Sequence, residues 1–161
     1  MHSEIRDADG VRAFYQAHVH PNVLEPLLAA PGKRYVVLVE AGAVVAAVSL
    51  QRRALRVEQV GGILVAPHRR GEGLTRLLLP AAFAEARAQG SRFLVGGVYR
   101  RAPDVSRLYR ALGFRTVVPY IPGAASWGPL GWLARSLARC FRVEAGPDAI
   151  RIMGGRVKKA A

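Results

Sequence analysis

The 161-residue sequence has little cysteine and no long apolar run. Its single cysteine, Cys140, excludes an intrachain disulfide and a cysteine-rich metal cluster, and it makes the cytoplasm the expected compartment. No apolar stretch is long enough to cross a bilayer, and the first residues lack the pattern of a signal peptide. The four histidines show no metal-binding spacing, so no metal site is expected.

Acidic residues are scarce in the second half of the chain. Residues 1–86 carry 10 basic and 8 acidic side chains, whereas residues 87–161 carry 14 and 3. The resulting net charge of +13 would suit a nucleic-acid partner, but the excess is almost all arginine, which codon usage can also produce. Nucleic acid is therefore an alternative partner only. The hydrophobic content of 51% favours one globular domain over residues 1–161.

The most informative stretch begins as a short apolar strand, Gly61–Val65, which Pro67 ends because proline has no N–H to donate. A basic turn with Gly71 and Gly73 follows, and the apolar spacing then becomes helical. Free N–H groups at a helix start attract an anion, and glycine lets the backbone approach it closely. The stretch therefore predicts a pyrophosphate-binding turn.

The remaining pattern predicts an α/β domain whose strands and helices alternate. The Gly61-Gly62 pair inside a strand predicts a β-bulge or the close approach of another backbone, and Asp7 or Asp9 is expected to cap the first helix. Strands are expected at 3–6, 34–40, 43–51, 54–65, 92–99, 115–120 and 149–154, and helices at 10–18, 22–30, 72–89 and from 103 to 112.

Two segments together resemble the GNAT N-acyltransferase superfamily. The first matches the pattern Val-x-Pro-x-x-Arg-Gly-x-Gly, and the second matches Leu-Tyr-x-x-x-Gly-Phe. The matching residues are Val65, Pro67, Arg70, Gly71, Gly73, Tyr109, Gly113 and Phe114. The chain departs from the family at His68, where Arg or Gln is usual, and at Ala102, where the family has an asparagine that contacts the pantetheine arm.

This resemblance implies a mixed, mostly antiparallel sheet with helices on both faces, splayed at the acyl-CoA site. Acetyl-CoA, or another acyl-CoA, would lie in that opening. The thioester would lie near Ile63, Leu64 and Val65, and the pyrophosphate would bind the turn. The expected turn residues are Arg70, Gly71, Glu72, Gly73, Leu74 and Thr75. The first two helices would border the acceptor, which makes Tyr15, His18 and His20 candidates to face it.

Acyl transfer to an amine needs a group that protonates the departing thiolate and a group that accepts the amine proton. Tyr109 is the candidate acid, as its family counterpart is, and Glu58 is the candidate base on the bulged strand. A purely structural role is the alternative for each residue. No nucleophile dyad is evident, which favours direct transfer.

The sequence therefore predicts an N-acetyltransferase acting on a primary amine of a small molecule or a protein. The alternative is a non-catalytic module that senses acyl-CoA or binds through its basic surface, and a homodimer is left open. A helical insertion is expected at about 121–149, with Trp127 and Trp132 bordering the acceptor site, followed by a basic tail at 156–161. The basic amphipathic pattern of the insertion would also suit ordinary packing against the core, or a membrane or partner surface.

Overall fold

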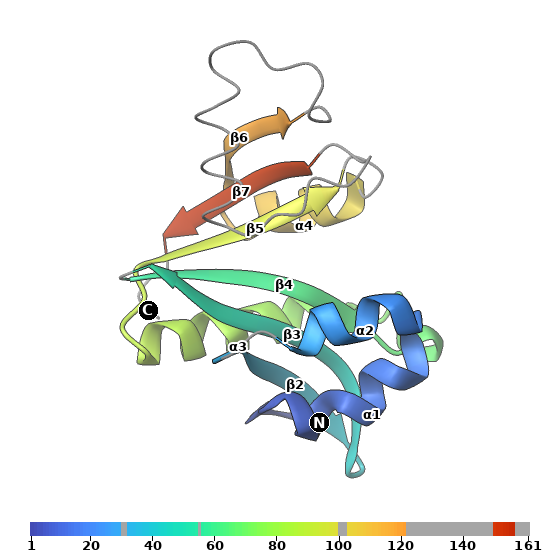
Figure 1. Cartoon of the computed structure of the whole chain (residues 1–161). Coiled ribbons are helices and arrows are strands. Elements are labelled where there is room, and N and C mark those ends of the chain that lie inside the picture. Colours follow the sequence, from blue (N-terminus) through green and yellow to red (C-terminus); the bar gives the residue numbers. More distant parts are fainter. Residues whose placement is uncertain (30–31, 55, 100–102, 122–149, 157–161) are drawn as a thin grey trace.

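A computed structural model describes residues 1–29, 32–54, 56–99, 103–121 and 150–156 (Figure 1). Except for Ile121 and Arg156, the expected insertion and basic tail lie outside these residues, and so do Trp127 and Trp132. In chain order the elements are β1 (His2–Arg6), α1 (Ala8–His18), α2 (Pro21–Leu28), β2 (Arg34–Glu40), β3 (Ala43–Ala54), β4 (Val57–Val65), the 3-10 helix η1 (Pro67–Arg69), α3 (Thr75–Ala88), β5 (Phe93–Tyr99), α4 (Pro103–Ala111), β6 (Arg115–Ile121) and β7 (Ile150–Arg156).

Seven strands form one sheet in the order β1-β2-β3-β4-β5-β7-β6. Only β4 and β5 pair in parallel, and the other neighbours are antiparallel. The parallel pair needs a crossover, which α3 supplies. The predicted mixed, mostly antiparallel sheet is therefore confirmed.

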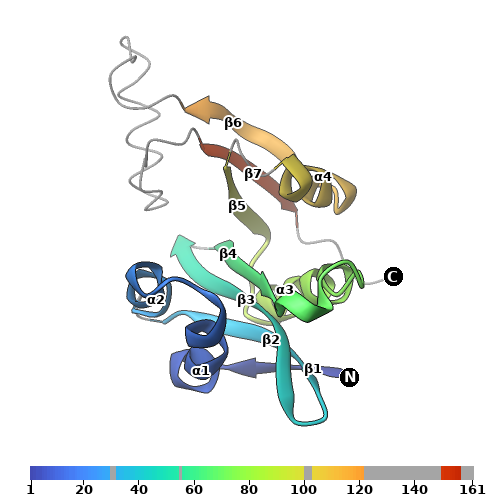
Figure 2. The same cartoon turned by 90° about the vertical axis from the view of Figure 1, so that its right-hand side faces the viewer.

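Helices cover both faces of the sheet, as predicted (Figure 2). Side chains of β2 alternate between two cores, because successive residues of a strand point to opposite faces. Val36 and Leu38 pack in the core that includes α3 and Tyr109 of α4, whereas Val37 and Val39 pack in the core of α1 and α2. The central strands are thus buried on both faces and form a rigid base for any site along their ends.

Strands β4 and β5 separate partway along their length. They pair only from Val57↔Phe93 to Val60↔Gly96, so among the described strands the second half of β4 is paired with β3 alone. The pairing with β3 also shifts register at this point, from Ser49↔Gly61 to Ala47↔Leu64. The bulge predicted from the glycine pair is present, and it coincides with the opening of the sheet.

Three boundaries differ from the sequence prediction by three residues each. Helix α3 begins at Thr75, three residues later than expected, because Gly71 and Gly73 have φ of +88° and +75°, outside the helical range. Strand β3 continues to Ala54, beyond its expected end. The chain then turns through Arg56, whose φ is +65°, and β4 starts at Val57.

Candidate active site

A cavity of about 360 Å³ lies where β4 ends and α3 begins. Eight of its nine lining residues are among those predicted from the sequence to bind the cofactor, and Arg69 is the ninth. Glu72, the remaining predicted residue, does not line it and instead pairs with Arg69. The lining residues are Ile63, Leu64, Val65, Arg69, Arg70, Gly71, Gly73, Leu74 and Thr75. We call this space the β4–α3 cavity.

The start of α3 offers backbone N–H groups to the β4–α3 cavity. No side chain caps this helix, and its first hydrogen bonds run from Arg76 to Gly73 (2.8 Å) and from Leu78 to Leu74 (2.9 Å). The earlier N–H groups in the first turn therefore have no intrahelical partner. A Cβ at Gly71 would meet nothing within 4 Å, so the space in front of the turn is open. Unpaired N–H groups and the helix dipole make this end suitable for an anion.

The arginines beside the turn differ in their partners. Arg69 pairs with both Glu40 and Glu72, and these contacts hold the pKa of each carboxyl below its usual value. Its charge is therefore largely neutralised. Arg70 is exposed, and its Nε donates to the carbonyl of Val65 at 3.4 Å. Among the ion pairs of the described residues none includes Arg70, so Arg70 is the more available cation.

Tyr109 on α4 lies over the point where β4 and β5 part. Its side chain is buried, and a Cβ built on Gly96 would lie 2.7 Å from its hydroxyl oxygen. Only glycine at position 96 leaves room for the phenol at this place. Burial raises the pKa of Tyr109, so its hydroxyl stays protonated and can donate a hydrogen bond. The sequence did not single out Gly96, although a glycine pair inside a strand signals a close approach.

Glu58 lies in the first half of β4 and is fully buried in an ion-pair network. Its Oε1 contacts Arg34 at 2.8 Å and Arg52 at 3.3 Å, and Arg34 also contacts Glu85 of α3 at 3.2 Å. Its Oε2 has no hydrogen-bond partner among the residues that the structure describes. The structure does not bring Glu58 to the β4–α3 cavity. Its role as a base stays a prediction, and the network supports the structural alternative.

The three candidates for the acceptor side have different positions. Tyr15 is buried, and its hydroxyl donates to the carbonyl of Gly62 in the bulge at 2.7 Å. His18 packs edge-on against Phe14 at the end of α1. His20 caps α2 by accepting from the N–H of Asn22 at 3.3 Å. Of these, only Tyr15 contacts the bulge.

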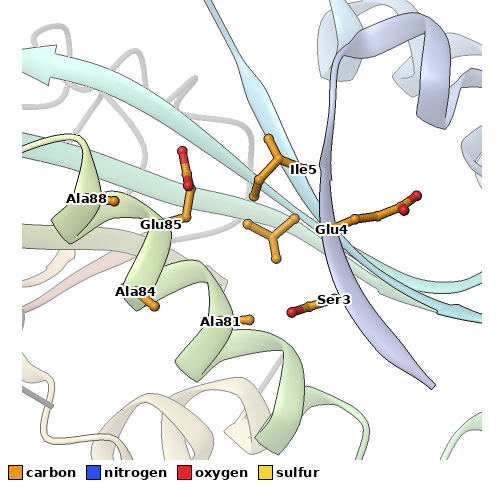
Figure 3. Close-up of a pocket in the computed structure, with 8 residues that line it drawn as sticks. Ser3, Glu4, Ile5, Ala81, Ala84, Glu85 and Ala88 are labelled. Atoms are coloured by element: carbon orange, nitrogen blue, oxygen red, sulfur yellow. The ribbon is translucent and has the colours of Figure 1, made fainter.

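A second cavity of about 340 Å³ lies between β1 and α3, far along the helix from its uncapped end (Figure 3). Small side chains on α3 leave this space open beside Ile5 of β1, which is 45% exposed. Its lining residues are Ser3, Glu4, Ile5, Val36, Ala81, Ala84, Glu85 and Ala88. Glu85 is engaged by Arg34 there, and no predicted site residue lines this cavity.

No helix in the described part of the chain is long and apolar enough to span a membrane. Within the same ranges, no three His, Cys, Asp or Glu side chains are grouped so that they would hold a metal ion.

The fold is shared with solved acetyltransferases. An IAA acetyltransferase from Bacillus cereus has 15% identity and a TM-score of 0.70, over 96% of this chain and 98% of that one. The ribosomal-protein-S18-alanine N-acetyltransferase from Escherichia coli has 18% identity and a TM-score of 0.69, over 99% and 97%. An aminoglycoside 6'-N-acetyltransferase complexed with coenzyme A has 13% identity and a TM-score of 0.64, over 100% and 99%.

The sequence itself identifies the family. A family model described as an acetyltransferase (GNAT) domain matches residues 31–116, which is more than half of the chain. The chain therefore belongs to the GNAT family and is an acetyltransferase. Among curated proteins, none matches the sequence significantly.

Proposed function

We propose that this acetyltransferase moves an acetyl group from acetyl-CoA directly to a primary amine of a small molecule or a protein. One observation carries the proposal: the half of β4 that has no second partner among the described strands begins at the pair Val60↔Gly96, beside the Tyr109 hydroxyl, and ends at the cavity where the uncapped helix α3 starts. The coenzyme A in one solved acetyltransferase of the same fold and the amine acceptors named for two of them support it.

The residues of the β4–α3 cavity fit the cofactor in chemistry and in place. The amides of the turn would bind its pyrophosphate, assisted by Arg70, while Ile63, Leu64 and Val65 would contact the acyl end. The open edge of β4 suits the amide-containing arm of the cofactor, because such an arm can pair with a strand backbone. Acetyl-CoA supplies an activated thioester.

The chain's own groups have two tasks in the transfer. Backbone N–H groups of the bulge would donate to the acyl carbonyl oxygen, on which negative charge develops as the amine attacks. The Tyr109 hydroxyl would donate its proton to the sulfur as the carbon–sulfur bond breaks, and the proton lost by the attacking nitrogen would pass through water to the resulting phenolate, so that the amide and the free thiol are the products. Because a phenol with a raised pKa gives up its proton reluctantly, we expect Tyr109 to act as a strong hydrogen-bond donor until the sulfur carries nearly full charge.

The test is an acceptor panel with acetyl-CoA as the donor. The panel contains an aminoglycoside, a polyamine, a free amino acid and a peptide with a free N-terminal alanine. Release of free thiol and the mass of the acetylated product are both measured, with propionyl- and hexanoyl-CoA as alternative donors. Acetyl-CoA binding with a product from at least one amine is expected. If calorimetry detects no binding of CoA or acetyl-CoA, the proposal is wrong.

A further inference from the structure

Two side-chain hydroxyls fix the carbonyl groups of the β4 bulge. Ser49 Oγ on β3 donates to the carbonyl of Gly61 at 2.9 Å, and the Tyr15 hydroxyl on α1 donates to the carbonyl of Gly62 at 2.7 Å. Ser49 and Tyr15 are 5% and 0% exposed, so water does not compete for either bond. The bulge is thus held from a neighbouring strand and from a helix that lies 47 residues away in the sequence.

These two bonds determine where the bulge directs its N–H groups. A trans peptide is planar, and its C=O and N–H point in opposite directions. Since the Gly61 carbonyl points to Ser49 on β3, the N–H of Gly62 points away from β3, to the side where β5 has separated. Since the Gly62 carbonyl points to α1, the N–H of Ile63 points away from α1.

The geometry leaves little freedom at this position. Gly62 has φ of +55°, and a Cβ there would lie 2.8 Å from Leu27 Cδ1 of α2. The ring of Tyr15 is held edge-on by Phe14 and Tyr35, with centroids 5.7 and 5.8 Å away. Burial also raises the pKa of Tyr15, so its hydroxyl remains a donor over the whole working pH range.

We propose that Tyr15 and Ser49 are positioning residues, which orient the Gly62 and Ile63 peptides so that their N–H groups polarise the acyl carbonyl. This inference rests on the proposed function, because it assumes a thioester beside the bulge. Neither residue touches the reacting atoms in this arrangement. Each acts through the peptide group that it holds, and the two bonds act on consecutive peptides.

The decisive variant is Tyr15→Phe, with Tyr35→Phe as its matched control. Both tyrosines are fully buried and their rings are in contact. Each hydroxyl donates to a backbone carbonyl, and the acceptor of Tyr35 is the carbonyl of Leu27 at 3.0 Å. Only the Tyr15 bond reaches the bulge. We expect Tyr15→Phe to lower kcat about 10- to 100-fold with an unchanged Kd for CoA, since a misplaced group can cost that much. Tyr35→Phe should keep kcat within about 3-fold.

Ser49→Ala gives an independent test that does not alter α1. It should lower kcat by about 10-fold, and its combination with Tyr15→Phe should lower kcat further than either change alone. Should Tyr15→Phe not fold, Ser49→Ala still decides the question. A kcat for Ser49→Ala equal to that of the wild type would overturn the role of Ser49.

Two readouts do not depend on turnover. Isotope-edited infrared spectra of bound acetyl-CoA should show a carbonyl stretch at lower frequency in the wild type and in Tyr35→Phe than in Tyr15→Phe. In the protein without ligand, the amide signals of Gly62 and Ile63 should exchange faster in Tyr15→Phe than in Tyr35→Phe. Equal infrared and exchange behaviour in the two variants would overturn the inference.

Failure of the positioning role and failure of the proposed function would give different results. A wild-type protein that acetylates amines, while Tyr15→Phe and Tyr35→Phe behave alike in every measurement, leaves the proposed function intact and overturns the positioning role. A wild-type protein that binds neither CoA nor acetyl-CoA overturns the proposed function, and the inference falls with it.

Discussion

The two halves of β4 have the same neighbour on one side and different surroundings on the other. From Val57 to Val60 the strand is paired with β3 and β5, and it carries Glu58 in a buried ion-pair network. From Gly61 to Val65 it is paired with β3 alone, and three of its residues line the β4–α3 cavity. One strand thus combines a closed structural half with an open half that can accept a ligand.

The charged side chain of this strand and the half that we propose to bind the ligand therefore lie apart. The only ionisable side chain of β4, Glu58, is in the closed half, whereas the open half offers backbone groups and apolar side chains. Reasoning from the sequence alone favours the carboxylate of Glu58 as a catalytic residue. We propose that the chemistry instead rests on peptide N–H groups and on Tyr109, which reaches the boundary between the two halves from α4.

The largest expected effect lies at the boundary between the halves. Tyr109→Phe should lower kcat about 100- to 10,000-fold, because one general acid contributes that much, with little change in acyl-CoA affinity. Gly96→Ala should reproduce much of this loss, because its methyl carbon would lie 2.7 Å from the hydroxyl oxygen of Tyr109 and would push the phenol out of place. Single-turnover kinetics and calorimetry check both variants. A wild-type kcat in Tyr109→Phe, where chemistry limits the rate, would leave Tyr109 a packing residue only.

The pH dependence of kcat tests the same group. Tyr109 would act in its protonated form, and burial raises its pKa above the usual ~10 of a phenol. The protonated form therefore persists through pH 10, and activity should rise with pH as the amine deprotonates, without an alkaline fall below pH 10. Rates measured from pH 6 to 10 check this. A fall that begins near pH 8 would point to a different acid.

The next effect concerns the turn at the open end. Gly71→Val and Gly73→Val should each weaken CoA binding by at least about 10-fold, because a side chain would cover the amides in front of the uncapped helix. Gly90→Val is the matched control: Gly90 also has positive φ, +78°, with nothing within 4 Å of its Cβ position, and it follows the other end of α3. The shared backbone strain of about 1–2 kcal/mol then cancels. Equal CoA affinities in all three variants would contradict the proposed role of the turn.

A smaller effect on activity, but a clear one on stability, is expected in the closed half. Glu58→Gln should lower the free energy of unfolding by about 3 kcal/mol, because it leaves Arg34 and Arg52 without their shared buried carboxylate. Glu85 contacts the same Arg34 from a partly exposed position, so Glu85→Gln should lower the free energy of unfolding by less. Urea denaturation and kcat are measured together. A large loss of kcat and of its acid-side pH dependence, at unchanged stability, would instead establish Glu58 as the base.

The sequence predicted those features that depend on residues close together in the chain. The glycine pair at 61 and 62 predicted the bulge, and the turn between Pro67 and Thr75 predicted five of the nine residues that line the cavity. Sequence alone did not reveal the partners of Glu58, because the bulge hides which side chains share a face and both arginines lie on other strands. Nor did it reveal Ser49, since nothing distinguishes a serine that holds a bulge from any other serine in a strand.

The smallest expected effect is on CoA binding, when an exposed arginine is removed from one end of α3 or from the other. Arg70→Ala should weaken CoA binding about 3-fold at low salt, because an exposed charge pair contributes less than about 1 kcal/mol. Arg87→Ala removes an equally exposed arginine from the last turn of the same helix, away from the β4–α3 cavity, and should leave the affinity unchanged. Raising the ionic strength from 0.05 to about 0.5 M should remove most of the difference, since the screening length falls to a few ångströms. Identical salt dependence in the two variants would show that Arg70 does not face the bound phosphates and that the amides of the turn bind the anion without it.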